Sequence, residues 1–481
     1  MRIHKSLIFI FSVIALLALV CLFFPADGVK IGGWTLRFPT LQSVMRGNAE
    51  DAKEKELQEA ATMADELARQ QARIDSLAAD SVARQEELKR LYEQVMTENI
   101  SRIYFPNDDF SYFDAFYEAA AAARHDGRTI RVVHYGDSQI ELDRISSTLR
   151  RYFQGLFGGG GPGMLPVVQS CPSPTVSQWA SENYSLYSPY GVANHDKSGQ
   201  YGIMAKSYRV AGSGSCSVTR SYATRVRLLL NDRKGNFSAT LTSDDFTEIQ
   251  ECDSVGGFRI LEWHLPAAAK TFKLNFSGTA DLFAILADCG AGIAVDNIPM
   301  RGCSGTMFTQ ISSELLRQSY RQTDVGMIIL QYGGNAMPAL RGKGGVEAYA
   351  NNIGRQIRYL KQVCPNTPIL FIGPSDMSTT VNGTRQSYPL MDDVVEALKT
   401  AALDNGAAFW NMYEVMGGHN SMLAWVSHGL AGTDYVHFSS AGANKIAQYL
   451  QEAFEFSYQH YRIGKGEQVV LPTEAATAPE P

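Results

Sequence analysis

The sequence lacks several signals that would indicate common classes of protein. Its 481 residues hold 43 Lys and Arg against 49 Asp and Glu, a formal charge of −6. It therefore offers no broad cationic surface for nucleic-acid phosphates. Its 7 cysteines include no CxxC pair, which argues against a ribbon-type metal site. No GK[ST] phosphate loop and no GxSxG elbow occur. We predict no nucleic-acid partner, no metal and no cofactor.

Charge is missing from Leu7 to Phe24, an apolar run that follows Arg2 and Lys5. At 1.5 Å per residue this run reaches roughly 27 Å, enough to cross a bilayer core. The positive flank predicts a cytoplasmic amino terminus and a single pass through the inner membrane, with the rest of the chain in the periplasm. A cleaved signal peptide is the alternative. We favour the uncleaved anchor, because bulky Phe23 and Phe24 and then Pro25 occupy the place of a cleavage site.

Glycine and proline are missing between Gly47 and Pro106, where Ala, Glu, Gln, Arg and Leu predict a long helix. Residues at alternate steps of three and four from Leu57 to Val95 share one stripe of this helix, its seam. The seam is apolar at both ends and polar in the middle. Two interpretations stay open. The helix is either a coiled coil that forms a homodimer or a solvated spacer that lifts the protein off the membrane.

A regular alternation of strands and helices predicts an α/β domain. A β-branched and apolar strand, Thr129 to Tyr135, leads into Gly136, and the alternation resumes after residue 290. Such connections require a five-stranded parallel sheet covered by helices on both faces. The further strands are Gly292 to Ile298, Val325 to Tyr332, Pro368 to Gly373 and Ala407 to Met412. The expected helices are Tyr112 to Arg124, Ile140 to Phe157, Thr306 to Tyr320, Val346 to Val363, Met391 to Asn405 and Ser440 to Phe456.

Helical periodicity is absent between about 162 and 290, where alternating segments predict an inserted β-sandwich-like domain. Its strand candidates are Arg225 to Asn231, Phe237 to Thr242, Phe258 to His264, Thr271 to Phe276 and Leu282 to Ala287. The predicted organisation is therefore a membrane anchor (1–28), a helical spacer (29–105), the α/β domain in two parts (106–161 and 291–463), the insert (162–290) and a disordered tail (464–481).

Residues able to perform acyl transfer follow the strands of the α/β domain, in the segments YGDSQ (135–139), RGCSGT (301–306), QYGGNA (331–336) and DYVHF (434–438). In a parallel sheet such segments gather at one edge. Ser138 needs a base to lose its proton, and His437 supplies one if Asp434 orients it. A developing oxyanion needs fixed donors, which the backbone N–H groups of Ser138 and Gly305 and the amide of Asn335 provide. Each motif alone is common in turns and helix caps. Their joint order along the chain is what indicates catalysis.

These four segments resemble the blocks of the SGNH/GDSL hydrolases over residues 128–160 and 290–458. The resemblance implies a flavodoxin-like SGNH fold with Ser138 as nucleophile, Gly305 and Asn335 in the oxyanion hole, and His437 with Asp434 as base. The sequence departs from the family at Gln139, where Leu is usual, and at Ala336, where Asp is common. We expect Asp137 and Gln139 to support the site from behind.

The resemblance extends to bacterial enzymes that act on O-acetylated cell-wall or surface polysaccharide. The leading hypothesis is a carbohydrate O-acetylesterase that works through an acyl-serine. An O-acetyltransferase supplied by a membrane acyltransferase uses the same residues, and pocket shape decides between water and sugar as acceptor. A non-catalytic glycan-binding scaffold is the third hypothesis. Trp179, Tyr184 and Tyr187 are candidates for stacking on sugar, and the pairing of the cysteines stays open.

Overall fold

The computed structural model describes residues 29–31, 34–36, scattered positions between 62 and 76, and 81–469 apart from 192 and 253–255. The predicted anchor, Leu7 to Phe24, lies outside these residues, and so does most of the predicted tail. Among the described residues, no helix is both long and apolar enough to cross a membrane. The chain forms two compact units, 1–84 with 470–479 and 85–469 with 480–481. In the first, β1 (Val29–Ile31) pairs antiparallel with β2 (Trp34–Leu36).

The second unit is built on a parallel sheet with the order β12-β4-β13-β14-β17. The strands are β4 (Thr129–Gly136), β12 (Gly292–Pro299), β13 (Val325–Gln331), β14 (Ile369–Ile372) and β17 (Ala408–Trp410). In chain order this is 2-1-3-4-5, the flavodoxin-like arrangement. The predicted α/β fold with parallel strands is confirmed. A two-residue strand, β3 (Ile103–Tyr104), adds an antiparallel edge to β17 that is too short to leave a sequence pattern.

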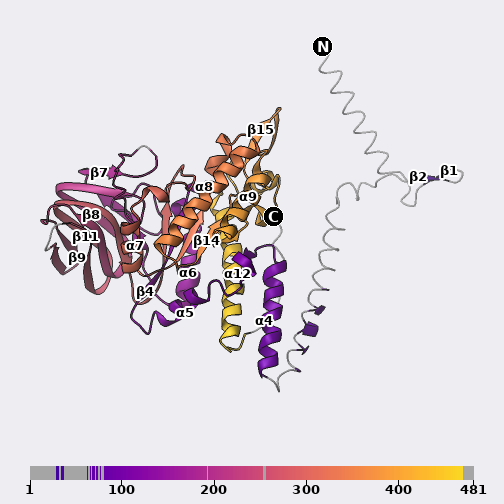
Figure 1. Cartoon of the computed structure of the whole chain (residues 1–481), viewed down its shortest axis with the longest axis horizontal. Coiled ribbons are helices and arrows are strands. Elements are labelled where there is room, and N and C mark those ends of the chain that lie inside the picture. Colours follow the sequence, from indigo (N-terminus) through magenta and orange to yellow (C-terminus); the bar gives the residue numbers. More distant parts are fainter. Residues whose placement is uncertain are drawn as a thin grey trace, which may run out of the picture. The chain divides into compact units, whose positions relative to one another are not determined.

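Helices cover both faces of this sheet (Figure 1). On one face, Phe153 of α6 (Ser146–Phe157) contacts Phe116 of α5 (Asp114–Ala122) and Phe454 of α12 (Ser440–Gly464). On the other face, Val133 and Tyr135 join a core with α7 (Ser313–Gln322), α8 (Gly342–Val363) and α9 (Met391–Asp404). Every residue of β4 is buried, as expected for a strand packed on both sides.

The end of the predicted spacer forms α4 (Ser81–Glu98). Leu88, Leu91, Tyr92 and Met96 are buried along one stripe of this helix, and Glu93 contacts His460 of α12 at 3.1 Å. The carboxyl end of the predicted seam is therefore part of the α/β unit, and most of the remaining seam lies outside the described residues.

The insert is an antiparallel sheet with the main order β10-β9-β11-β8-β6. Its framework is two long strands, β8 (Ser207–Asp232) and β11 (Phe258–Asp288). The prediction of three separate strands between 258 and 287 was wrong, because register shifts near His264 and Ala280 let one strand bend without a turn. The curved sheet encloses its own apolar core, which includes Trp263. Shorter strands complete it: β5 (Gly163–Leu165), β6 (Ser177–Ala180), β7 (Tyr184–Tyr187), β9 (Ser238–Ser243) and β10 (Phe246–Glu251).

Candidate active site

The four predicted segments meet beyond the carboxyl edge of the parallel sheet. Ser138 follows β4, Gly305 follows β12, and Asn335 lies in a 3₁₀ turn, Gly334–Ala339, that follows β13. The turn that carries Asp434 and His437 precedes α12. The fold thus gathers at one edge side chains that are widely separated in the chain, as a doubly wound sheet requires.

Ser138, His437 and Asp434 form a continuous hydrogen-bonded chain. The Ser138 Oγ lies 2.8 Å from His437 Nε2, and His437 Nδ1 lies 2.8 Å from Asp434 Oδ2. With its Nδ1 proton directed to Asp434, the imidazole presents an unprotonated Nε2 to the serine hydroxyl. This is the geometry in which a histidine can accept the serine proton.

Asp434 and His437, the predicted acid–base pair, lie on a tight turn. Asp434 Oδ1 accepts hydrogen bonds from the backbone N–H groups of Val436 at 3.0 Å and His437 at 3.1 Å, which leaves Oδ2 for the imidazole. Partial burial acts to raise the pKa of Asp434, but the hydrogen bonds from the His437 side chain and these backbone groups outweigh it and lower the pKa. Asp434 is therefore held as the carboxylate that an imidazolium needs beside it.

A hairpin outside the predicted blocks supports this turn. It consists of β15 (Ser378–Val381) and β16 (Thr384–Ser387). Tyr435 has a left-handed backbone with φ 60°, which is costly for an aromatic residue. Its carbonyl accepts from Ser378 N–H at 3.0 Å, and the Arg385 guanidinium lies 4.1 Å from its ring centroid. No sequence motif marks these contacts.

Ser138, the predicted nucleophile, lies at the start of a strained turn. The predicted helix from Ile140 was wrong in its first turn: residues 138–143 form a 3₁₀ segment in which Leu142 and Asp143 have φ values of 61° and 58°. Asp137 caps this segment by accepting the Gln139 N–H at 2.9 Å. The turn places Ser138 directly after β4, with its side chain toward His437.

The predicted oxyanion donors lie around the same point. Gly305 has φ +81°, and a Cβ there would lie 2.7 Å from the Tyr332 ring, so glycine is required. The Asn335 amide donates to Asp137 Oδ2 at 3.0 Å and to the Cys303 carbonyl at 3.2 Å. Both amide hydrogens are thus engaged and the side chain is fixed. For Asn335 to donate to an oxyanion, one of these bonds must be shared or exchanged.

Asp137 is the buried neighbour of Ser138. Its side chain is 5% exposed, and burial raises its pKa to about 6, although the bonds from Gln139 and Asn335 and the charge of His437 act in the opposite direction. The protonation of Asp137 therefore changes within an ordinary working range of pH.

Gln139 and Arg144 join the serine turn to the histidine turn. The Gln139 amide donates to the Val436 carbonyl at 2.6 Å and accepts from the Phe438 N–H at 3.3 Å, on either side of His437. Arg144 donates to the carbonyls of Ser138 and Phe438, both at 2.8 Å. Gln139 was expected here from its place after the serine. Arg144 was missed, since an arginine near a helix start has no distinctive spacing.

Among the residues that the structure describes, no group of three or more His, Cys, Asp or Glu side chains is arranged to hold a metal ion. The thiols of Cys171, Cys216, Cys289, Cys303 and Cys364 are free.

Comparisons with known proteins bear on the family and the fold. The model of the GDSL-like Lipase/Acylhydrolase family matches residues 275–445. A solved structure described as "Peptidoglycan O-acetylesterase in action, 5 min" matches with a TM-score of 0.58 and 23% identity, over 72% of this chain and 96% of that chain.

A family two carbohydrate esterase from Cellvibrio japonicus matches at 11% identity with a TM-score of 0.25, over 59% of this chain and 99% of that chain. One from Clostridium thermocellum, solved with cellohexaose, matches at 9% identity with a TM-score of 0.25, over 53% and 95%. The search of curated proteins found no match.

Residues 275–445 therefore match the GDSL-like hydrolases, and the chain is similar in fold to a solved O-acetylesterase. It is an enzyme that acts on ester bonds.

Proposed function

We propose that the enzyme removes O-acetyl groups from cell-wall or surface polysaccharide through an acyl-serine intermediate. The observation that carries the proposal is the chain of 2.8 Å contacts from Ser138 through His437 to Asp434. A serine hydroxyl without such a base is too weak a nucleophile near neutral pH.

The reaction follows from these contacts. Ser138 Oγ attacks the ester carbonyl while its proton passes to His437 Nε2, and Asp434 stabilises the imidazolium. The carbonyl oxygen becomes an oxyanion that accepts from the donors at Ser138, Gly305 and Asn335. The intermediate collapses as the sugar oxygen leaves with the proton from Nε2. Water then gives a proton to Nε2 and attacks the acyl-serine, and Nε2 returns that proton to Ser138 Oγ as acetate leaves.

The exposure of the site favours water over a sugar as the acyl acceptor. The side chains of His437 and Asp434 are 40% and 52% exposed. Water therefore reaches the imidazole of His437, the group that would activate it for attack. A transferase has to exclude water from its acyl-enzyme. We therefore place hydrolysis ahead of transfer.

The insert supports a glycan as substrate. Among the three predicted stacking residues, Trp179 is 58% exposed, whereas Arg209 covers the Tyr187 ring at 4.1 Å and Tyr184 donates to the Ser215 carbonyl at 3.0 Å. Trp179 is thus the best of them for packing on a pyranose ring. The similar solved structure is itself described as a peptidoglycan O-acetylesterase.

The test is release of acetate by the purified protein from acetylated polysaccharide and from an aryl acetate. Ser138→Ala should lower kcat by several orders of magnitude, while Ser185→Ala, at an exposed position of β7, should leave it unchanged. Equal rates for Ser138→Ala and the parent protein would refute the proposal.

A second experiment separates hydrolysis from transfer. With an oligosaccharide added as acceptor, mass spectrometry should find free acetate as the main product. Acetylated oligosaccharide as the main product would instead favour the transferase and its membrane acyltransferase partner.

We also propose that Leu7 to Phe24 anchors the enzyme in the inner membrane, with the active site in the periplasm. The support is the uncharged run and its positive flank. After cell fractionation the full chain should remain with the membrane and be digested by protease added to spheroplasts. Recovery in the soluble periplasmic fraction would indicate cleavage instead.

A further inference from the structure

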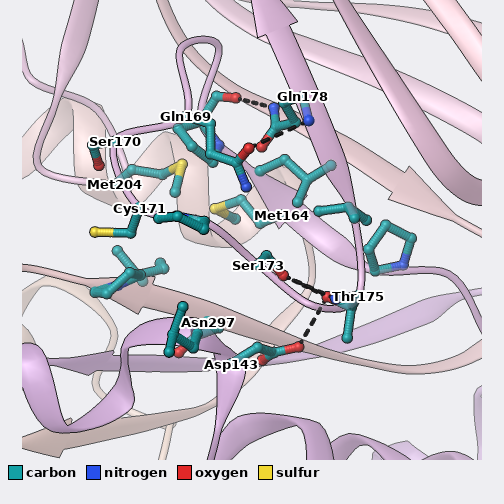
Figure 2. Close-up of a pocket in the computed structure, with 18 of the residues that line it drawn as sticks. Asp143, Met164, Gln169, Ser170, Cys171, Ser173, Thr175, Gln178, Met204 and Asn297 are labelled. Carbon is teal, nitrogen blue, oxygen red and sulfur yellow. Dashed lines mark hydrogen bonds between the residues drawn. The ribbon is translucent and has the colours of Figure 1, made fainter.

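A pocket lies between the insert and the turn that follows Ser138 (Figure 2). It has a volume of about 60 Å³. Leu142, Asp143 and Asn297 line it from the α/β side, and the insert contributes a run of polar residues that includes Gln169, Ser170, Cys171, Thr175 and Gln178 together with Lys206. The pocket thus begins at the far end of the turn that carries the nucleophile.

Lys206 is the only cation of the insert in the wall of this pocket. Its ammonium makes a long 3.4 Å contact with Ser170 Oγ, and within the described residues it forms no ion pair with a carboxylate. It lies 5.9 Å from the centroid of the Tyr190 ring. Burial lowers the pKa of Lys206, and the charges of Cys171, Glu141 and Cys303 act in the opposite direction. The protein therefore holds a partly buried cation there without a carboxylate partner among the described residues.

Glu141, the carboxylate whose charge acts on Lys206, already forms an ion pair with Arg301. Glu141 receives Arg301 Nε at 2.7 Å on one oxygen and Arg301 Nη2 at 2.6 Å on the other, and the Cys171 thiol donates to it at 3.3 Å. This bidentate pair neutralises Glu141. The group around Glu141, Arg301 and Lys206 consequently keeps one positive charge.

Cys303 connects this charge to the catalytic residues. Its carbonyl accepts from the Asn335 amide at 3.2 Å. Burial is the largest effect on its thiol, whose pKa rises to about 11, and the charges of both Asp137 and Lys206 also act on it. Cys303 thus contacts Asn335 and is close enough to Lys206 for the charge of the ammonium to act on its thiol. Tyr190, whose ring lies near Lys206, has a buried hydroxyl without a hydrogen-bond partner among the described residues.

We propose that Lys206 and the pocket around it form a subsite for a carboxylate carried by the glycan beside the acetylated sugar. The ammonium binds the carboxylate, and the hydroxyl and amide groups of Ser170 and Gln169 complete a polar wall. This subsite makes the enzyme selective for acidic glycans over neutral ones. The inference rests on the proposed esterase function and names its substrate class.

The experiment compares chemically acetylated oligogalacturonate with equally acetylated neutral oligogalactose, and uses an aryl acetate as a third substrate. For Lys206→Met, KM on the acidic substrate should rise about ten- to hundredfold, the value of one charge-assisted hydrogen bond. KM on the neutral substrate and kcat on the aryl acetate should stay within about twofold. Lys206→Arg should recover most of the loss. As a control, Lys270→Met should leave KM and kcat unchanged, because Lys270 is an exposed residue of β11.

Salt offers an independent measurement on the parent enzyme. KM for the acidic substrate should rise with ionic strength, and KM for the neutral one should not. Equal KM changes on both substrates in Lys206→Met, or no change on either, would overturn the subsite while leaving the esterase intact. If the parent enzyme releases acetate from none of the three substrates, the proposed function itself fails.

Discussion

At the scale of single residues, the site depends on groups that hold the reacting atoms in register. Ser138 and His437 are separated by 299 positions, and the two turns that carry them touch through Gln139 and Arg144. A nucleophile and its base need a fixed separation, because a misplacement of about 1 Å can cost on the order of a hundredfold in rate.

Replacing Gln139 by Leu, the residue usual in the family, should lower kcat on an aryl acetate by about ten- to hundredfold. The leucine cannot bond the Val436 carbonyl or the Phe438 N–H, so both backbone groups lose a partner and the histidine turn loosens. KM should stay within about twofold, since Gln139 is buried and its amide is engaged by the histidine turn. A rise in KM with unchanged kcat would contradict a positioning role.

Asp137 gives the protein a distinctive pH dependence of stability. Burial raises its pKa to about 6, above the value near 4 in an unfolded chain. The folded state therefore binds more protons than the unfolded state between these values, and it loses stability as the pH rises through them. Above about pH 6 the loss is complete.

Asp137→Asn removes this titration. Relative to that variant, the parent protein should lose on the order of 2 to 3 kcal/mol of unfolding free energy between pH 4 and pH 7. Urea unfolding of both proteins at each pH measures the difference in their unfolding free energies. Groups that titrate alike in the two proteins cancel in this difference. Parallel stability curves would show that the pKa of Asp137 is the same in the folded and unfolded states.

At the scale of elements, the sequence predicts the bounds of a strand or helix well wherever its apolar residues follow a single period. All five parallel strands lie within two residues of their expected bounds, because strands buried on both faces are rich in apolar and β-branched residues. The order of the four motifs also indicates which side chains gather at the sheet edge.

The failures have physical causes too. The bends of β11 depend on register shifts, and the start of the helix after Ser138 is replaced by left-handed residues. Both arise from long-range packing, which local preferences do not encode. The support that Arg144 and Arg385 give to the site likewise depends on contacts between distant segments.

The helix α4 illustrates an ambiguity that only tertiary packing resolves. Its apolar stripe suits a partner helix or a domain surface equally well, and the structure directs it to the α/β unit. Leu91→Ala should destabilise that unit by about 2 to 4 kcal/mol, because Leu91 is 4% exposed and its truncation leaves a cavity. Gln94→Ala, on the exposed face of α4, should stay within about 0.5 kcal/mol. Equal effects in chemical unfolding would mean that α4 does not pack there in solution.

At the scale of the whole unit, a buried ion network joins the insert to the parallel sheet. Arg131 of β4 donates to Asp296 of β12 at 2.8 Å and to Asp288 of β11 at 2.9 Å, and Arg227 of β8 reaches Asp288 at 3.2 Å. Asp288, Asp296 and the Arg131 side chain are at most 1% exposed. Buried charges of this kind are tolerated only when each is paired.

The network predicts that insert and sheet unfold together. Asp288→Asn leaves Arg131 and Arg227 with one fewer carboxylate charge in a dry environment, and it should cost about 3 to 5 kcal/mol. Tryptophan fluorescence reports both parts, since Trp263 is buried in the insert and Trp410 in the sheet. In urea, variants that keep only Trp263 or only Trp410 of the 5 tryptophans, with the rest replaced by Phe, should give one shared midpoint that shifts equally in Asp288→Asn. Two separate midpoints would show that the insert folds by itself, and the pocket at Lys206 would then lie at a movable junction instead of within a rigid unit.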